Sequence, residues 1–362
     1  MIKKYEHGGN IYSAQRKTGD SHVLDFSANI NPVGLSEKVR QTLLDNIDNV
    51  VHYPDAEAYQ LRKSICRHYG IKEEMLVLGN GATELFYILV HVLKPEKIFL
   101  PVPSFSEYEK SSLCIDVQVE YFLLPCENNF VVNYEEMLHK IPSNALIFLG
   151  NPNNPTGKLL EREGLENFLQ KTWAKNCKII LDESFIDFLE CSDYYSLLRF
   201  CYAYDHVFLV HSLTKIFAIP GLRLGFGVFP QAWAKKVEGA KDCWNVNNLA
   251  QAAGIAALDD KEYLKKSKIL VKEYRDNFYK ELASIKAIKI YPSEVNFLLL
   301  DIKNTGMTSA QLCSEMAKHS VLLRDCANYH GLDDGYVRVA VRNKAENREF
   351  TNILKKVCEI NG

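Results

Sequence analysis

The chain has 362 residues, of which 47% are hydrophobic and 24% charged, an ordinary balance for a globular protein with a sizeable core. Lys and Arg total 43 against 45 Asp and Glu, so the net charge of −2 favours neither nucleic acid nor an anionic membrane as a partner. The length exceeds one typical domain, and we therefore expect one large domain followed by a smaller one.

The N-terminal segment MIKKYEHGGNIYSAQRKTGD is basic but lacks the apolar stretch of a secretory signal. No run approaches the roughly 18 apolar residues of a membrane span. The ten cysteines include no C-x-x-C pair and the ten histidines no H-x-x-x-H pair, so we expect reduced cysteines and no metal site. These features predict a cytoplasmic protein.

Residues 1–35 carry turn signals such as HGGN and NINPVG, and we expect a loop-like arm there. Amphipathic patterns predict helices over 36–48 and 56–69. Short apolar runs then alternate with helical patterns, which is typical of a mostly parallel sheet covered by helices on both faces. The predicted strands are 97–100, 145–149, 178–181, 206–210 and 224–229, and the predicted helices are 83–93, 105–114, 161–175 and 231–241.

Residues 250–283 have the pattern of one or two long helices, and the tail beyond them is α+β in character. We expect strands near 287–291, 296–301, 320–324 and 336–341, with helices near 308–319 and 345–360. The pattern thus predicts an α/β chain in three parts: an arm over residues 1–35, a large domain over 36–250, and a smaller C-terminal domain over 251–362.

Ligands of open α/β sheets bind at the carboxyl ends of the strands, so the residues after each strand are candidates. GNPNNPTGK at 150–158 is either a plain turn or a set of amides facing a ligand. Asp182 is either a helix N-cap or a buried carboxylate that needs a cationic or hydrogen-bonded partner. Lys215, before the apolar IFAIPGL, is either a surface lysine or a desolvated amine of lowered pKa, suited to a Schiff base.

GNGATELF, residues 79–86, is a glycine-rich turn that leads into a helix and offers backbone N–H groups to a phosphate. It is neither a Walker A loop, since no G-K-[ST] follows, nor a dinucleotide fingerprint. With Arg223 in GLRLGFG, the strand ends supply an amine, a carboxylate, amides and a phosphate turn. Pyridoxal 5′-phosphate (PLP) is a ligand that uses all of them.

The ordered motifs GNGATE, NPNNPTG, DESF, SLTK and GLRLG resemble those of the fold-type I PLP enzymes, specifically the aspartate and histidinol-phosphate aminotransferases, over nearly the whole chain. The resemblance implies a mostly parallel sheet sandwiched by helices plus a smaller C-terminal α+β domain. It implies that Lys215 forms the Schiff base and that Asp182 partners the pyridine nitrogen. Asn154 would hydrogen-bond the phenolic oxygen, and Phe105 would stack on the ring. The implied phosphate ligands are Ser212, Arg223 and the backbone of Gly81, Ala82 and Thr83.

Tyr53 in HYPD resembles a tyrosine that reaches the phosphate of the neighbouring subunit's cofactor, which implies a homodimer with shared active sites. Arg338 matches the arginine that clamps the substrate α-carboxylate, a task suited to a planar guanidinium. Phe185 departs from the tyrosine usual in aminotransferases and cannot donate to the phenolic oxygen. This departure disfavours efficient transamination and leaves Asn154 as the named side-chain donor.

Three further segments, HGGNI at 7–11, DFSANINPVG at 25–34 and LLRDCANYHGL at 322–332, resemble the L-threonine-O-3-phosphate decarboxylases of cobalamin biosynthesis. Histidinol-phosphate aminotransferases are the nearest neighbours within the family. The resemblance implies an arm folded over the active site, whereas the alternative is a plain disordered terminus. The substrate contacts that it implies are His7, Gly8, Gly9, Asn10, Asn31, Asn154, Arg324 and Arg338.

Orientation selects the reaction, because the bond held perpendicular to the cofactor ring is the one weakened. If Arg338 holds the carboxylate in the ring plane, the Cα–H bond breaks and transamination follows. If cations gather on a substrate phosphate and turn the carboxylate out of plane, CO₂ leaves. Arg342 shares a strand face with Arg338 at period two, and either points into the site or pairs with Glu346.

The resemblance therefore predicts PLP-dependent decarboxylation of L-threonine O-3-phosphate to 1-amino-2-propanol phosphate. L-serine O-phosphate differs by one methyl, worth only about 1–3 kcal/mol in a pocket, so both substrates stay open. The alternative is a histidinol-phosphate aminotransferase. A third possibility, a PLP-fold binding module without catalysis, is disfavoured by the joint presence of Lys215, Asp182 and Arg223.

Overall fold

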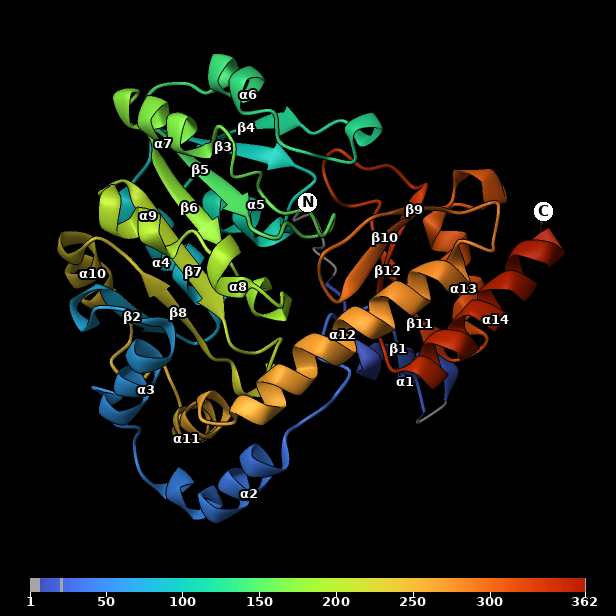
Figure 1. Cartoon of the computed structure of the whole chain (residues 1–362), viewed down its shortest axis with the longest axis horizontal. Helices are drawn as coiled ribbons and strands as arrows, with labels where there is room; N and C mark the ends of the chain where they lie inside the picture. The colour runs from blue at the N-terminus through green and yellow to red at the C-terminus, as the bar shows by residue number, and fades with distance from the viewer. Residues whose placement is uncertain (1–6, 20–21, 362) are drawn as a thin grey trace.

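The computed structural model describes residues 7–19 and 22–361, whose strands form a large sheet, a small sheet and a two-stranded pairing at the N-terminal arm (Figure 1). Residues 1–6 and 20–21 of the predicted arm, and residue 362 of the predicted small domain, lie outside the described residues. The α/β class and the mostly parallel main sheet are confirmed.

The large sheet has seven strands in the order β2-β8-β7-β6-β5-β3-β4. Its neighbours pair in parallel except around β8, which runs antiparallel to both β2 and β7. Every residue of β5 and β7 is buried, as expected for strands covered on both faces. The strands are β2 (Leu76–Gly79), β3 (Lys97–Val102), β4 (Gln118–Leu123), β5 (Ala145–Gly150), β6 (Lys178–Asp182), β7 (Val207–Ser212) and β8 (Gly225–Val228).

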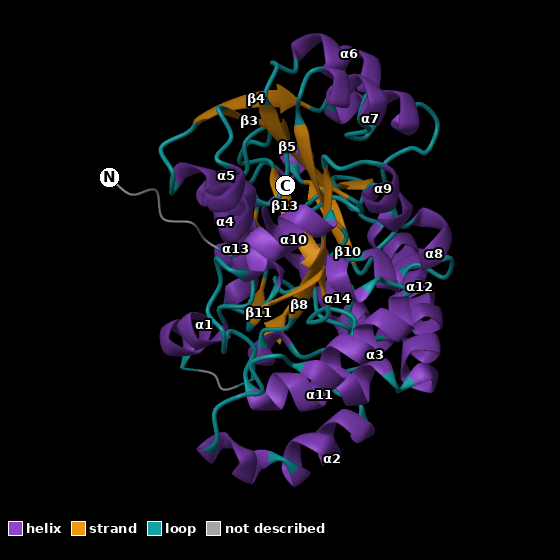
Figure 2. Ribbon diagram, turned by 90° about the vertical axis from the view of Figure 1, so that its left-hand side faces the viewer, coloured by secondary structure: helices purple, strands orange, loops and turns teal. Residues whose placement is uncertain are grey.

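Helices cover both faces of this sheet, and Figure 2 shows α4 and α5 on one side of the strands with α7 and α9 on the other. Successive strand residues face opposite sides, so that Ile147 packs in one core and Phe148 in the other. One face carries α4 (Ala82–Leu93), α5 (Ser106–Leu113) and α10 (Gln231–Glu238). The other carries α3 (Tyr59–Tyr69), α6 (Tyr134–Lys140), α7 (Leu165–Ala174), α9 (Leu198–Ala203) and α11 (Asn248–Leu258).

The second sheet is small and antiparallel, in the order β12-β13-β10-β9. The long α12 (Lys261–Leu282) leads to it from α11 (Figure 1). The predicted boundary after residue 250 falls inside α11, which packs against α2 (Glu37–Asp45) and α3. The remaining elements are α8 (Ser192–Tyr195), β9 (Lys289–Tyr291), β10 (Phe297–Asp301), α13 (Ser309–Ala317), β11 (Val321–Leu322), β12 (Arg324–Asp325), β13 (Tyr336–Ala340) and α14 (Lys344–Asn361).

The N-terminal arm is more ordered than the turn signals predicted. Asn10 caps a helix, α1 (Ile11–Thr18), by accepting a hydrogen bond from the backbone N–H of Ser13. A short strand, β1 (Leu24–Asp25), then pairs in parallel with β11. Phe26 follows it into the core of the small sheet, so burial of apolar side chains ties the arm to the C-terminal part of the chain.

No helix among the described residues is long and apolar enough to cross a membrane. All ten cysteines are free thiols, in agreement with the expectation from their scattered spacing.

Candidate active site

A cavity of about 420 Å³ lies at the carboxyl ends of the central strands, where the small sheet and the arm face the large sheet. It is lined by residues that follow β5, β6 and β7 and by side chains from β12 and β13. The sequence-predicted residues that it brings together are His7, Gly8, Ala82, Thr83, Phe105, Asn154, Asp182, Ser212, Lys215, Arg223, Arg324 and Arg338.

Lys215 lies three residues beyond β7 and faces the cavity between Asp182 and two arginines. Burial lowers the pKa of its ammonium to about 8, the charges of Arg223 and Arg338 act in the same direction, and Asp182 opposes them. About one tenth of the protein molecules therefore have a neutral Lys215 amine at pH 7, far more than for a lysine at the ordinary value of 10.5. A neutral amine is the form that attacks a carbonyl carbon.

We expect the rate at which PLP binds to Lys215 of the cofactor-free protein to rise with pH through a midpoint near 8. An Arg338→Met variant loses one charge that disfavours the ammonium, so its midpoint should move to higher pH. Rapid-mixing absorbance measurements over a pH series check this. A midpoint near the ordinary lysine value of 10.5 would contradict the assignment.

Asp182 ends β6 and is the carboxylate of the cavity. Its Oδ2 accepts a 2.6 Å hydrogen bond from the hydroxyl of Tyr108, and its Oδ1 accepts one of 2.9 Å from the backbone N–H of Ser184. Burial raises the pKa of the Tyr108 phenol, which therefore stays a donor, and its ring stacks on Phe148 with centroids 5.0 Å apart. Asp182 is thus a buried, partnered carboxylate at a strand end rather than a helix N-cap.

The glycine-rich turn before α4 closely approaches Arg223. Gly81 has a φ of +80°, and a Cβ placed on it would lie 2.4 Å from Nη2 of Arg223. Only glycine therefore allows the guanidinium to lie against the turn. The hydroxyl of Ser212 lies 2.8 Å from that of Thr214, both lining the cavity. This arrangement presents a cation, hydroxyls and the N–H groups of the first turn of α4 to one point, as an anion requires.

Arg338 enters the cavity from β13 and is 5% exposed. Its Nη1 donates to Oδ1 of Asn154 at 2.6 Å, and its Nη2 donates to the carbonyl of Ser27 at 2.8 Å. The Nε is buried without a partner among the described residues. Phe185 and Phe105 also line the cavity, and Phe105 is the residue that directly precedes α5.

The arm reaches the cavity through its first described residues. His7 Nε2 lies 2.7 Å from Oε1 of Glu107, and both residues line the cavity. A Cβ on Gly8 would lie 1.9 Å from the carbonyl oxygen of Ser27, so this glycine permits a close backbone approach. Gly9 donates its N–H to the hydroxyl of Ser27 at 2.7 Å and does not line the cavity.

Three further residues that the sequence predicted at the site lie elsewhere, as does Arg342. Asn10 caps α1, and Arg342 pairs with Glu346 at 3.1 Å, which is the alternative that the sequence left open. The Asn31 amide is buried behind Lys215, where it donates to the carbonyl of Ile216 and the hydroxyl of Ser267, each at 2.7 Å. Tyr53 is 77% exposed and stacks on Trp244 with centroids 4.4 Å apart.

The cavity also contains residues that the sequence did not single out: Ser27, Tyr108, Glu107, Lys110, Ser184, Thr214 and Tyr329. Glu107 and Tyr108 lie on α5, two and three residues after Phe105. Their position in the first turn of a predicted helix was the only signal that the sequence offered. No sequence pattern indicated that their partners would be Asp182 and His7, because those contacts join segments far apart in the chain.

These residues fit PLP, judged by the chemistry of the donor set. A lysine of lowered pKa suits attachment through an imine, a carboxylate suits a ring nitrogen, and the turn beside Arg223 suits a phosphate. The unpartnered Nε of Arg338 leaves a donor for a further anionic group.

Comparison with known proteins agrees with this chemistry. A family model described as aminotransferase class I and II matches residues 21–354. A threonine-phosphate decarboxylase of Salmonella typhimurium is 34% identical over 97% of this chain and 96% of its own length. A histidinol-phosphate aminotransferase of Methanococcus aeolicus is 31% identical over 92% of this chain and 90% of its own.

Among solved structures, a histidinol-phosphate aminotransferase from Clostridium acetobutylicum has a TM-score of 0.87 and 33% identity, covering 93% of this chain and 100% of its own. The similarity thus spans both sheets and the cavity between them. The chain therefore belongs to the aminotransferase class I and II family, whose members are PLP-dependent.

Proposed function

We propose that the protein is a cytoplasmic PLP-dependent decarboxylase of L-threonine O-3-phosphate in cobalamin biosynthesis, giving (R)-1-amino-2-propanol O-phosphate and CO₂. The relative from Salmonella typhimurium, named a threonine-phosphate decarboxylase, supports this proposal at 34% identity. The proposal depends mainly on two buried arginines in the cavity, for which the described part of the chain supplies no acidic partner.

Arg324 and Arg338 are cross-strand neighbours on β12 and β13, and they are 4% and 5% exposed. Within residues 7–19 and 22–361, no ion pair links either of them to a carboxylate. Buried charges without a counter-ion are costly to keep. A substrate with two anionic groups would supply the missing charges, and threonine phosphate has a carboxylate and a phosphate.

Two further basic side chains, those of Lys110 and His7, line the same cavity. Lys110 lies 3.3 Å from Oε1 of Glu107, and His7 lies 2.7 Å from the same oxygen. One carboxylate thus faces two basic groups, while Arg324 is held by the Asn328 side chain at 2.8 Å. The buried guanidinium of Arg324 favours a phosphate at that residue, and the α-carboxylate would then bind Arg338.

In the proposed reaction the bond between Cα and the carboxylate breaks, CO₂ leaves, and a proton takes its place on Cα. PLP, when bound, supplies an electron sink for the charge left on Cα. Asp182 would hold the ring nitrogen, with Tyr108 and Ser184 fixing the carboxylate. Lys215 Nζ, with a pKa of about 8, would return the proton to Cα.

We also propose a homodimer with shared active sites. Tyr53 is exposed outside the cavity of its own chain, so any contact it makes with a cofactor would be in a second copy. Nearby on η1 (Ile47–Val51), Val50 and Val51 are 58% and 78% exposed. A cluster of exposed apolar side chains of this kind favours association.

The second candidate is a histidinol-phosphate aminotransferase, favoured by the Clostridium acetobutylicum structure at 33% identity. Histidinol phosphate also has a phosphate group, so a phosphate contact at Arg324 does not distinguish the aminotransferase from the decarboxylase. Phe185 favours the decarboxylase, because a phenyl ring at this wall of the cavity donates no hydrogen bond.

The deciding experiment supplies the purified holoenzyme with phosphothreonine and no 2-oxo acid. We expect CO₂ and 1-amino-2-propanol phosphate in equal amounts, with phosphoserine run in parallel. Glutamate formation from histidinol phosphate and 2-oxoglutarate, with no CO₂ from phosphothreonine, would show that the protein is the aminotransferase instead.

An Arg324→Met variant should raise the KM for phosphothreonine by about 30- to 100-fold, because a charge-assisted contact to the phosphate is lost. Its turnover of threonine, which has no phosphate, should change little. Arg342→Met is the matched control, since Arg342 pairs with Glu346 outside the cavity. An equal loss for threonine and phosphothreonine would mean that Arg324 does not contact the phosphate.

A further inference from the structure

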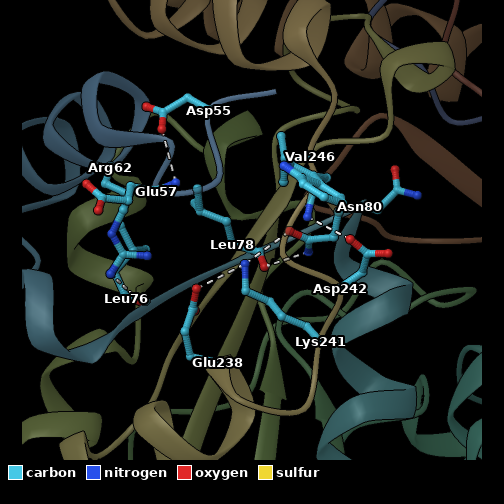
Figure 3. A network of polar contacts seen from close by, with 12 residues as sticks. Asp55, Glu57, Arg62, Leu76, Leu78, Asn80, Glu238, Lys241, Asp242 and Val246 are labelled. Carbon is cyan, nitrogen blue, oxygen red and sulfur yellow. Dashed lines mark hydrogen bonds and ion pairs between the residues drawn. The ribbon is translucent and has the colours of Figure 1, made fainter. Parts of the chain in front are cut away.

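The loop between α10 and α11, residues 239–247, contacts the glycine-rich turn from outside the cavity. Nδ2 of Asn245 donates to Oε2 of Glu84 at 2.7 Å and to the carbonyl of Leu78 at 3.1 Å. Figure 3 shows Lys241, Asp242 and Val246 of this loop beside Leu78 and Asn80. None of these loop residues lines the cavity.

Glu84 occupies the third position of α4, in the helical turn that would receive the cofactor phosphate. A free carboxylate there would repel a phosphate dianion. Instead, its Oε2 accepts a hydrogen bond of 2.7 Å from the backbone N–H of Asn80, as well as the one from Asn245. The carboxylate is thus turned back toward the loop, which leaves the N–H groups of the helix start to the cavity.

Lys241 determines which way the Asn245 amide faces. Its side chain is 4% exposed, donates to Oδ1 of Asn245 at 3.0 Å and pairs with Glu238 at 3.1 Å. An ammonium only donates hydrogen bonds, so the amide oxygen of Asn245 must face Lys241. The amide nitrogen must then face Glu84, which only accepts.

We propose that Asn245 is a positioning residue for the cofactor phosphate. It acts through Glu84, holding that carboxylate away from the anion and fixing the turn from Asn80 to Thr83. This inference rests on the proposed placement of the phosphate at the turn and is independent of which reaction the enzyme catalyses. Its effect should appear in cofactor binding before any substrate is added.

The test compares PLP with pyridoxal, which has the same ring and aldehyde but no phosphate. Dissociation constants are measured by equilibrium dialysis against the cofactor-free protein. We expect Asn245→Ala to weaken PLP about tenfold and to leave pyridoxal unchanged, since one hydrogen bond to a charged group is lost. Adding Glu84→Gln to Asn245→Ala removes the carboxylate charge from the turn and should restore part of the lost PLP affinity.

Asn347→Ala is the matched control for a loss of general stability. Asn347 donates to the carbonyl of Arg342 at 2.7 Å and accepts from its N–H at 2.9 Å, far from the turn. It should lower Tm without changing the ratio of PLP to pyridoxal affinity. If Asn245→Ala also leaves that ratio unchanged, Asn245 is merely structural and the inference fails.

A Ser212→Ala variant separates this inference from the placement on which it rests. If Ser212→Ala weakens PLP selectively and Asn245→Ala does not, the phosphate lies at the turn and only the role of Asn245 is overturned. If neither variant distinguishes PLP from pyridoxal, the phosphate placement and the role of Asn245 both fail. If the protein released no CO₂ from phosphothreonine, the proposed reaction would be wrong, but the comparison of PLP with pyridoxal affinity would still test the role of Asn245.

Discussion

Replacing Lys215 with alanine should reduce CO₂ release from phosphothreonine by on the order of 10⁴-fold or more, because the attacking amine and the proton donor are lost together. The protein should still fold, since the side chain faces a cavity. Borohydride trapping of bound PLP measures the loss of the attacking amine, and steady-state CO₂ release measures the loss of turnover.

Lys158 provides the matched control. It lies in the NPNNPTGK turn, and burial lowers the pKa of its ammonium as well, but it does not line the cavity. A Lys158→Ala variant should trap PLP like the unmodified protein. Trapping of PLP by Lys215→Ala at the original stoichiometry would overturn the assignment of the cofactor lysine.

Replacing Asp182 with asparagine should lower kcat about 10³-fold, with a smaller change in KM. The substitution keeps the shape and an acceptor for Tyr108, but removes the charge expected next to the ring nitrogen. Preorganised charge of this kind typically accounts for about 10²–10³-fold in rate. Steady-state kinetics with phosphothreonine at saturating PLP gives the value.

Asp187 is the control carboxylate, because it too is buried and accepts a tyrosine hydroxyl, that of Tyr69 at 2.7 Å. Burial alone would raise the pKa of the Asp187 carboxylate, but His211 lowers this pKa to about 2. The charge of Asp187 is therefore part of a structural ion pair with His211. Asp187→Asn should lower Tm and leave kcat within a few-fold. Equal kinetic losses in both variants would show that Asp182 acts only on stability.

Much of the fold was predictable because the central strands are buried on both faces. Continuous apolar runs therefore marked β5, β6 and β7, and the polar residues within five positions after these runs include Asp182 and Lys215. The edge strand β4 was missed because only one residue of QVEYFL, Phe122, is buried, so the segment has neither a continuous apolar run nor a strict alternation. The first strand of the sheet, LVLG at β2, was also not predicted, although all four of its residues are buried.

The rest of the site depends on contacts between distant segments. Tyr108 and Asp182 are separated by 74 positions and Asn245 and Glu84 by 161, so local periodicity gives no sign of either pairing. Asn31 was expected at the substrate, yet its amide donates to the carbonyl of Ile216, next to Lys215, and to the hydroxyl of Ser267 on α12. A polar side chain shows which chemistry is available, whereas packing determines what it contacts.

The antiparallel pairing of β8 with β7 sets Ser212 opposite Gly225, so the lysine and arginine segments leave the sheet side by side. Adding or removing one residue between Lys215 and Arg223 would shift their spacing and disturb both proposed cofactor contacts. The proposed substrate contacts, in contrast, come from the arm and the small sheet. In relatives of this chain, we therefore expect substrate preference to differ through changes in the arm and the small sheet. The connection between β7 and β8, which holds Lys215 and Arg223, should keep its length.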